Sequence, residues 1–341
     1  MRCTLMQQPG KSLAQDGEIL TLPMKNFIFN AHPARVIFGD GARRRLADEM
    51  RMLGLTRAVV LTTPDQERLG HEAAEWLGSS CVTVYPGAVM HVPVGSVEAA
   101  GEVVRKANAD CVVAVGGGST TGLAKALALT LDLTIVAVPT TYAGSEMTPI
   151  YGITEGGLKR TGKDARVLPK LVIYDPQLTE SLPTGIAITS GFNAIAHAAE
   201  GLYAQDASPL MELAAEEGIR AIAAALPLLS AGDQQRNARS DLLYGAWLCG
   251  MVLGSVGMAL HHKLCHTLGG TFNLPHAELH TVILPHALSF NAQAAPQAMQ
   301  RIARAIGRTD ASAGLFALAE QLDLLSAGRR SNFCVISPPR R

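Results

Sequence analysis

The sequence predicts a chain in two parts, a parallel α/β part followed by an all-helical part. Short apolar strands alternate with amphipathic helices through the first half, which is typical of a parallel sheet covered on both faces. From about Pro183 onward the strand signals stop, and alanine- and leucine-rich helical stretches follow. With 341 residues, 48% of them hydrophobic, the chain is long enough for two ordinary domains. A cleft between two such domains is a common place for a ligand site.

The expected elements follow in order along the chain. Strands are expected at 35–39, 57–63, 81–87, 111–119 and 134–141, and helices at 66–78, 94–109, 190–204, 209–229, 241–270 and 296–308. The uncharged stretch 242–260 is nearly long enough to span a membrane. Its four glycines and charged flanks are more typical of a tightly packed central helix, so we expect no membrane association.

The composition excludes several classes of function. Lys and Arg together number 29, as do Asp and Glu, and a chain without a basic excess is not typical of a nucleic-acid binder. The six cysteines include no CxxC pair, and their spacing fits neither a disulfide framework nor a zinc knuckle. Reduced thiols, and a first segment without the apolar run of a signal peptide, predict a cytoplasmic protein.

A glycine-rich loop lies between an expected strand and an expected helix. In "VVAVGGGSTTGLAKAL" (112–127) the strand runs into three glycines, and a helix is expected to begin near Thr120 or Thr121. Glycines let the backbone approach an anion, and a helix N-terminus offers free N–H groups to a phosphate. We expect the pyrophosphate of a dinucleotide here, bound by Gly116, Gly117, Gly118, Ser119 and Thr120. The alternative is that these glycines only form a tight turn between the strand and the helix and bind no ligand.

The next expected strand ends in a group of hydroxyl side chains. Thr140, Thr141 and Ser145 follow it in "VPTTYAGSE" (138–146). Because the carboxyl ends of parallel strands lie at one edge of a sheet, these residues are expected to bind the rest of the dinucleotide. Hydroxyl residues also cap helices, so the glycine loop gives this prediction most of its weight.

The helical part carries a cluster of histidines. Asn193 and His197 are four residues apart and share one helical face, and His262 and His266 share another. His276 follows shortly afterwards. A lone histidine on an apolar helix is usually a core residue, but so many in one region indicate a site. Metal ligation and acid–base catalysis are both open at this point.

These motifs resemble those of the iron-dependent (group III) alcohol dehydrogenase family. The matching stretches are 116–119, "PTTYAGSE" (139–146), "NAIAHAAEG" (193–201) and "HHKLCHTLGGTFNLPH" (261–276). The resemblance runs from about Phe27 to about Leu325, and within the family it is strongest to the maleylacetate reductase branch. It implies a Rossmann-like parallel-sheet dinucleotide-binding domain followed by an all-helical catalytic domain, a dehydroquinate synthase-like architecture.

The resemblance also implies an activity. It implies reduction of the C=C bond of 2-maleylacetate to 3-oxoadipate, in bacterial degradation of aromatic compounds, by a homodimer that takes a small dicarboxylate. Members that prefer NAD tend to carry an acidic residue after the second strand, where this chain has Thr63. We therefore expect either NADH or NADPH as cofactor.

The resemblance leaves the metal in question. Family dehydrogenases bind iron or zinc through one aspartate and three histidines, and these positions fall on Asn193, His197, His262 and His276. Asn193 is a neutral amide, and Gly122 replaces an aspartate found in metal-dependent members. We therefore expect that no metal is required and that the four positions are vestigial. A metal-dependent alcohol or polyol dehydrogenase is the alternative.

Without a metal, the histidines are expected to supply hydrogen bonds and a proton. Hydride addition at the carbon β to a ketone gives an enolate, which hydrogen bonds can stabilise. The expected catalytic residues are His266, as general acid, with His262, His197 and His276, and the expected substrate-binding residues are Asn193, Lys263 and Lys163. Most of the basic segment 157–166 that contains Lys163 is expected to be a solvated loop.

The two ends depart from the family pattern. We divide the chain into an extension at 1–23, a dinucleotide-binding domain at 24–182, a helical catalytic domain at 183–325 and an atypical tail at 326–341. The tail has no helical periodicity, which would fit a truncation or a shifted reading frame. An inactive dinucleotide-binding remnant is therefore a further alternative.

Overall fold

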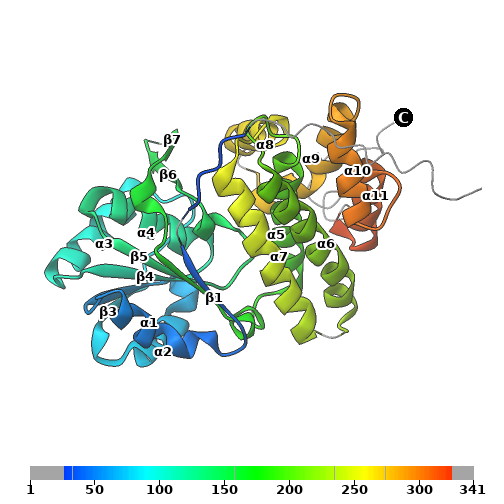
Figure 1. Ribbon diagram of the computed structural model, residues 1–341. Coiled ribbons are helices and arrows are strands. Elements are labelled where there is room, and N and C mark those ends of the chain that lie inside the picture. Colours follow the sequence, from blue (N-terminus) through cyan, green and yellow to red (C-terminus); the bar gives the residue numbers. More distant parts are fainter. Residues whose placement is uncertain (1–26, 33, 157, 234, 273, 325–341) are drawn as a thin grey trace, which may run out of the picture.

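The structure is a computed structural model that describes residues 27–324 except 33, 157, 234 and 273. Figure 1 shows two parts side by side, a parallel sheet with helices on both faces and a bundle of helices. The expected extension at 1–23 and the tail at 326–341 lie outside the described residues.

Six parallel strands form the sheet. They are β1 (Arg35–Phe38), β2 (Ala58–Leu61), β3 (Cys81–Tyr85), β4 (Cys111–Gly116), β5 (Thr134–Pro139) and β8 (Leu171–Tyr174), in the order β1-β8-β5-β4-β2-β3. Every neighbouring pair is parallel. The expected strands are present, although β4 stops at Gly116 and the next helix begins at Gly118, earlier than expected. The sequence reasoning did not identify β8, a run of only four residues.

Both faces of the sheet are buried, which explains why its strands are continuous apolar runs. Val113 and Val115 of β4 pack in the same cluster as residues of α1 (Leu46–Met52) and α2 (Glu67–Leu77). Val112 and Ala114 point the other way, into the cluster that contains residues of α3 (Val94–Lys106) and α4 (Gly118–Leu131). Short 3₁₀ turns complete this part: η1 (Ala42–Arg45), η2 (Pro64–Gln66), η3 (Gly78–Ser80), η4 (Ser145–Met147), η5 (Ala165–Val167) and η6 (Pro176–Thr179).

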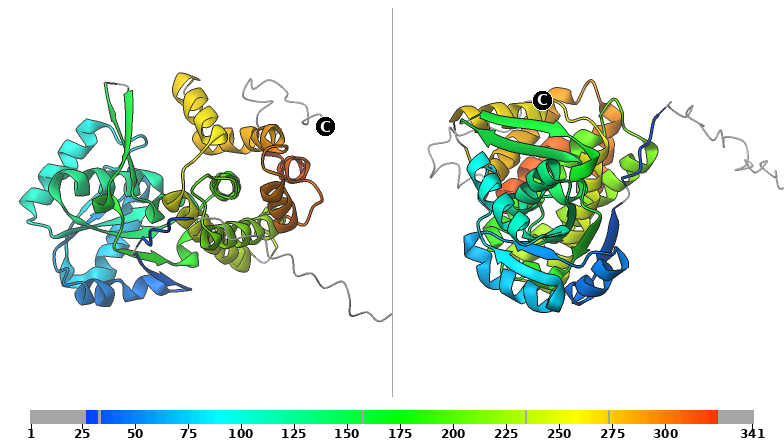
Figure 2. Two further views of the ribbon diagram at one scale, coloured as in Figure 1. Left: turned by 45° about the horizontal axis from the view of Figure 1, so that its top comes forward. Right: turned by 90° about the vertical axis from the view of Figure 1, so that its left-hand side faces the viewer.

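A two-stranded antiparallel hairpin projects from the sheet half (Figure 2). Its strands are β6 (Ile150–Glu155) and β7 (Leu158–Lys163). Thr154 anchors it, since its N–H donates to Val92 O at 3.0 Å and its hydroxyl to His91 O at 2.7 Å. The expectation of a solvated loop at 157–166 was therefore wrong for β7. The charged side chains of this strand do not give the apolar pattern from which a strand is predicted.

Seven helices form the second half of the described chain. They are α5 (Thr184–Gly201), α6 (Pro209–Ala231), α7 (Gln235–Ser255), α8 (Leu260–Phe272), α9 (His276–Asn291), α10 (Pro296–Ala305) and α11 (Ala311–Gln321). The single helix expected at 241–270 is two helices bent by 94° at the break between α7 and α8. Among the described residues, no single helix is long and apolar enough to cross a membrane, although this bent pair meets the criteria of length and composition together.

Glycines on α7 bring the two halves into close contact. A Cβ at Gly250 would lie 2.7 Å from Gly144 O, and a Cβ at Gly254 would lie 2.5 Å from Met147 O. Gly144 itself has φ +75°, a conformation that favours glycine. Glycines in the uncharged stretch therefore allow α7 to pack directly on the loop that follows β5.

Candidate active site

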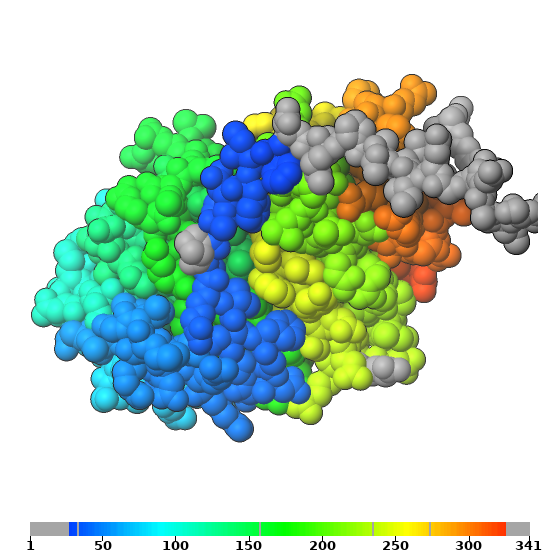
Figure 3. Space-filling view, in the orientation of Figure 1, coloured from blue at the N-terminus to red at the C-terminus, as the bar shows by residue number. Residues whose placement is uncertain are grey.

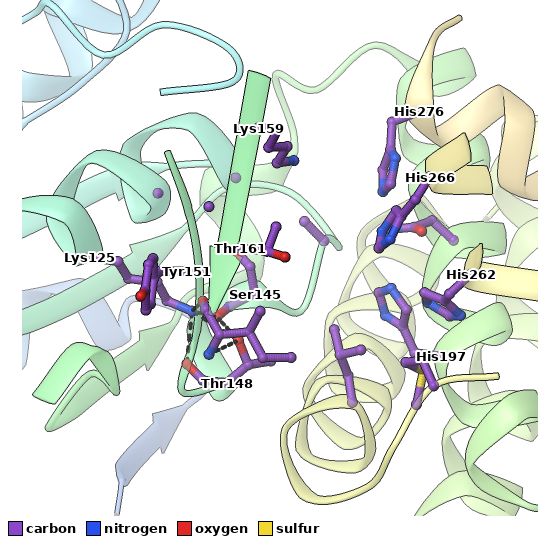
Figure 4. Close-up of a pocket in the computed structure, with 18 of the residues that line it drawn as sticks. Lys125, Ser145, Thr148, Tyr151, Lys159, Thr161, His197, His262, His266 and His276 are labelled. Carbon is purple, nitrogen blue, oxygen red and sulfur yellow. Dashed lines mark hydrogen bonds between the residues drawn. The ribbon is translucent and has the colours of Figure 1, made fainter. Parts of the chain in front are cut away.

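A cavity of about 580 Å³ opens between the two halves. One wall comes from the start of α4, the loop after β5 and the hairpin, and the other from α5, α7, α8 and the start of α9. Figure 4 shows the lysines and hydroxyls of the first wall facing the histidines of the second. On one face of the molecule, the first described residues lie along the junction of the halves (Figure 3), where His32 Nε2 is 3.0 Å from Gly254 O.

The start of α4 fits a phosphate. Among the described residues no side chain caps this helix, and nothing lies within 4 Å of the position a Cβ would take at Gly118. A free helix N-terminus beside open space is a ready anion site. It also lies at the point where the strand connections change direction between β2 and β4, which is where dinucleotides bind in such sheets.

The expected cofactor residues divide into two groups. Gly118, Ser119 and Ser145 line the cavity. The others, which are Gly116, Gly117, Thr120, Thr140 and Thr141, are absent from its described lining and support the loop. Thr120 donates its hydroxyl to Gly117 O at 2.8 Å, and Thr141 Cγ2 lies 2.8 Å from the position of a Cβ on Gly117.

Two further residues shape this wall and were missed by the sequence reasoning. Gln66, which ends η2 after β2, donates to Thr140 Oγ1 at 3.1 Å and so joins the loops of β2 and β5. Lys125 of α4 is buried, and its Nζ lies 2.7–2.9 Å from four oxygens, Ser145 O, Thr148 O, Thr148 Oγ1 and Ile150 O, which share its three N–H donors. Burial lowers the pKa of Lys125 to about 7. The sequence feature that could have identified Lys125 is its position as a lysine in an otherwise apolar helix.

Three helices bring the histidines together. Asn193 and His197 come from α5, His262 and His266 from α8, and His276 begins α9. Ring centroids are 5.1 Å apart for His197 and His262, and 6.2 Å apart for both His262–His266 and His266–His276. All five side chains line the cavity, as the sequence predicted that they would share one site.

Glu200 orients His262. This buried carboxylate accepts the Nδ1–H of His262 at 2.7 Å and the backbone N–H groups of Ala259 and His261 at 2.8 and 2.7 Å. Burial alone would raise the pKa of Glu200, but these hydrogen bonds outweigh it and lower the pKa to about 2. The other ring nitrogen of His262, Nε2, is buried and has no partner among the described residues. The sequence reasoning missed this role.

Three of the cavity histidines, His197, His266 and His276, have lowered pKa values. Burial lowers the pKa of His197 well below its ordinary value, and nearby histidines lower it further. Burial and the charge of His266 lower the pKa of His276 to about 4. The pKa of His266 is lowered by burial, by His262 and by the ammonium groups of Lys159 and Lys263. An anionic ligand that offsets these lysines would raise the pKa of His266 again.

Lysines from both walls make the cavity suitable for anions. Lys159 and Lys163 come from β7, and Lys263 comes from α8 on the opposite side. The Lys159 side chain lies over Gly152, where a Cβ would be 2.9 Å from its Cε. The sequence reasoning selected Lys163 and Lys263, but Lys159 is the hairpin lysine whose charge acts on both His266 and His276.

The residues at the family's metal position fit a metal poorly. Asn193 offers a neutral amide oxygen, which is buried and without a partner among the described residues, so the set has no anionic ligand. Within the described chain, His197, His262 and His276 are not among the groups whose three ligand atoms lie within 4.8 Å of one another. Gly122 is also tightly covered, because a Cβ there would lie 2.7 Å from Val92 Cγ2.

The sheet, the uncapped helix and the histidine cluster define a dinucleotide-dependent dehydrogenase of two domains. The chain belongs to the iron-containing alcohol dehydrogenase family, whose models match residues 33–176 ("Iron-containing alcohol dehydrogenase") and 187–327 ("Fe-containing alcohol dehydrogenase family, C-terminal"). The predicted fold class and family are confirmed. The family's description as iron-containing does not support the expectation that no metal is required.

Several individual members of this family are similar to the chain over most of its length. The chain is 60% identical over 301 residues to maleylacetate reductase of Burkholderia cepacia, covering 88% of this chain and 86% of that protein. It is 57% identical to maleylacetate reductase of Sphingobium indicum, with 86% and 83% covered. The crystal structure of maleylacetate reductase from Agrobacterium tumefaciens is similar with a TM-score of 0.86 and 50% identity, over 88% of this chain and 86% of that one.

Proposed function

We propose that this chain reduces the C=C bond of 2-maleylacetate with NADH or NADPH, giving 3-oxoadipate. The observation that carries the proposal is a cavity that joins an uncapped helix N-terminus to a histidine cluster without an acidic metal ligand. The similarity to maleylacetate reductases over most of the chain supports the same substrate. We further propose a cytoplasmic homodimer in bacterial breakdown of aromatic compounds. No nucleic acid or membrane takes part.

The reaction adds one hydride and one proton. A dihydronicotinamide cofactor, held at its phosphates by Gly118 and Ser119, would supply the hydride to the alkene carbon that is β to the ketone and next to a carboxylate. The C=C electron pair moves to form an enolate at the ketone, and the carbon α to the ketone then takes a proton. Neutral imidazole N–H groups of His197 and His276 are suited to hydrogen-bond the enolate oxygen, because an enolate needs less stabilisation than an alkoxide.

His266 donates the proton in this proposal. It lies on the exposed side of the cluster between His262 and His276, opposite the hairpin (Figure 4). Lys159 and Lys263 bind the two carboxylates of the substrate, and this pairing offsets the charges that lower the pKa of His266. Substrate binding therefore helps His266 hold the proton that it transfers.

The cofactor and metal requirements belong to the same proposal. Thr63 follows β2 at the edge where the adenosine ribose would lie, and a threonine does not repel a 2′-phosphate, so both NADH and NADPH are accepted. The poor fit of Asn193 and the three histidines to a metal supports a reaction that needs none. In this interpretation Asn193 helps to bind the substrate.

An assay with two kinds of substrate tests the proposed function. Purified protein is supplied either with maleylacetate and NADH or NADPH, or with primary alcohols and diols and NAD⁺, and the products are identified by mass spectrometry. We expect stoichiometric formation of 3-oxoadipate and negligible alcohol oxidation. Oxidation of alcohols without reduction of maleylacetate would contradict the proposal and favour the alternative dehydrogenase.

Replacing the proposed general acid tests the mechanism. His266→Ala should lower kcat by roughly 100-fold, because a positioned acid contributes about that much to proton transfer. The Kd for NADH, measured by fluorescence titration, should change by no more than about twofold. Turnover equal to that of the unaltered enzyme would show that another group donates the proton.

A further inference from the structure

A second cluster of ligating side chains lies behind the histidines of the cavity. His261 and Cys265 are one turn apart on α8, and both face His280 of α9. His261 Nε2 is 2.9 Å from His280 Nδ1, and Cys265 Sγ is 3.7 Å from His261 Nε2. All three side chains are at most 1% exposed, and none belongs to the described lining of the cavity.

Hydrogen bonds within the protein leave this cluster incompletely satisfied. His261 Nδ1 and His280 Nε2 are buried, and neither has a partner among the described residues. A buried imidazole nitrogen normally has a partner, and these two outer atoms have none, while the other nitrogen of each ring faces the neighbouring ring, with Cys265 Sγ beside it. The two inner nitrogens and the sulfur, rather than the unpaired outer atoms, are the group that could hold an ion.

We propose that His261, Cys265 and His280 form a binding site for a divalent transition-metal ion of the zinc type. Their ligand atoms lie within 4.8 Å of one another. Bond lengths of about 2.0–2.1 Å to nitrogen and about 2.3 Å to sulfur place tetrahedral ligands about 3.3 Å (N to N) and about 3.6 Å (N to S) apart. The observed 2.9 and 3.7 Å are within a few tenths of an ångström of these values.

The chemical types of the three ligands determine which ions would bind at this site. One thiolate with two imidazoles favours Zn²⁺ or Co²⁺ over Mg²⁺ or Ca²⁺, which prefer oxygen ligands. The ion replaces the thiol proton of Cys265, which leaves to solvent, and no oxidation or reduction takes place. The bound site carries a net charge of +1, and the Glu200 carboxylate, which accepts the backbone N–H of His261 at 2.7 Å, supplies the opposite charge. Cys265 thus provides the anionic ligand that the cavity cluster lacks at Asn193.

Cobalt binding tests the site without relying on activity. Protein stripped of metal under reducing conditions is titrated with Co²⁺, and the near-ultraviolet thiolate-to-cobalt charge-transfer band is followed, with Zn²⁺ displacing the Co²⁺. We expect one equivalent of bound Co²⁺ with this band. Cys265→Ser should remove the band and raise the Kd for Co²⁺ by roughly 100-fold. The control Cys249→Ser alters another buried thiol, on α7, and should leave the band and the Kd unchanged.

The outcomes separate this site from the cavity. His276→Gln should retain the band, because the His276 ring contacts His280, at 4.3 Å between centroids, but is not one of the three ligands. Binding of Co²⁺ without a thiolate band, or a band that persists in Cys265→Ser, would overturn the proposal. If circular dichroism shows that Cys265→Ser does not fold, His280→Gln is used instead, and there an unchanged Kd would overturn the proposal. The proposal does not depend on the substrate, so it can fail while the proposed function holds.

Discussion

At the scale of single residues, Glu200 determines what His262 can do. Its carboxylate accepts the Nδ1–H of His262, which leaves Nε2 available to a ligand, and it also accepts backbone N–H groups at the start of α8. These contacts occur where the chain bends by 94° between α7 and α8. One buried side chain thus stabilises the bend and orients a histidine of the site.

Glu200→Gln should destabilise the protein in a pH-dependent way. The folded pKa of about 2 lies below the ordinary value, so the carboxylate stabilises the fold above about pH 4.5, and this contribution is lost as the pH falls toward 2. We expect a loss of about 2–3 kcal/mol at pH 7 and a much smaller one at pH 3, measured by urea unfolding. Glu217→Gln, in an exposed pair with Arg220, should cost less than about 1 kcal/mol. Equal losses for Glu200→Gln at both pH values would contradict this role.

Lys159→Gln should change the pH profile as well as substrate binding. Lys159 lowers the pKa of His266, so its removal raises that pKa. If protonated His266 is the acid, kcat/KM falls as the pH rises through this pKa, and the falling limb should move to higher pH. The KM for maleylacetate should rise about tenfold, because a carboxylate loses its partner. Lys106→Gln, on the exposed side of α3, serves as the control. If the falling limb of the pH profile does not move in Lys159→Gln, Lys159 does not affect the pKa of His266.

At the scale of elements, the N-terminus of α4 is the proposed phosphate site. Gly118→Ala adds a methyl group in open space, so the fold should tolerate it, but the methyl group would occupy the place of the pyrophosphate. We expect the Kd for NADH to rise about tenfold or more, with an unchanged Tm. Gly95→Ala, also at the start of a helix with nothing described within 4 Å, should change neither quantity. Unaltered NADH affinity in Gly118→Ala would place the cofactor elsewhere.

Sequence patterns predicted the strands that are buried on both faces of the sheet. The strands of the sheet are buried on both faces and read as apolar runs, so they were found with errors of a few residues. The hairpin was missed because Lys159, Arg160 and Lys163 are exposed side chains that do not pack in a core. The break before α8 was missed because Glu200, the carboxylate that accepts N–H groups at the break, is some sixty residues away in the sequence. Helix α9 was missed, and a proline at position 285 interrupts its pattern.

At the scale of the whole molecule, the site exists only where the two halves meet. Motifs in the sequence identified the glycine loop and the cavity histidines, because each is a local pattern. Gln66, Lys125 and Lys159 were not identified, because their roles depend on partners brought near by the fold. The division of the chain at 182/183 stays a prediction.

The most direct test of the account is maleylacetate reduction by protein without metal. NADH consumption and 3-oxoadipate formation are measured before and after exhaustive chelation, with the metal content determined in the same samples. The account predicts that turnover survives chelation, because the histidines act through their own hydrogen bonds and protons. Turnover that disappears with the metal and returns with Fe²⁺ or Zn²⁺ would contradict it, and would show that Asn193 and the three histidines still bind a catalytic ion.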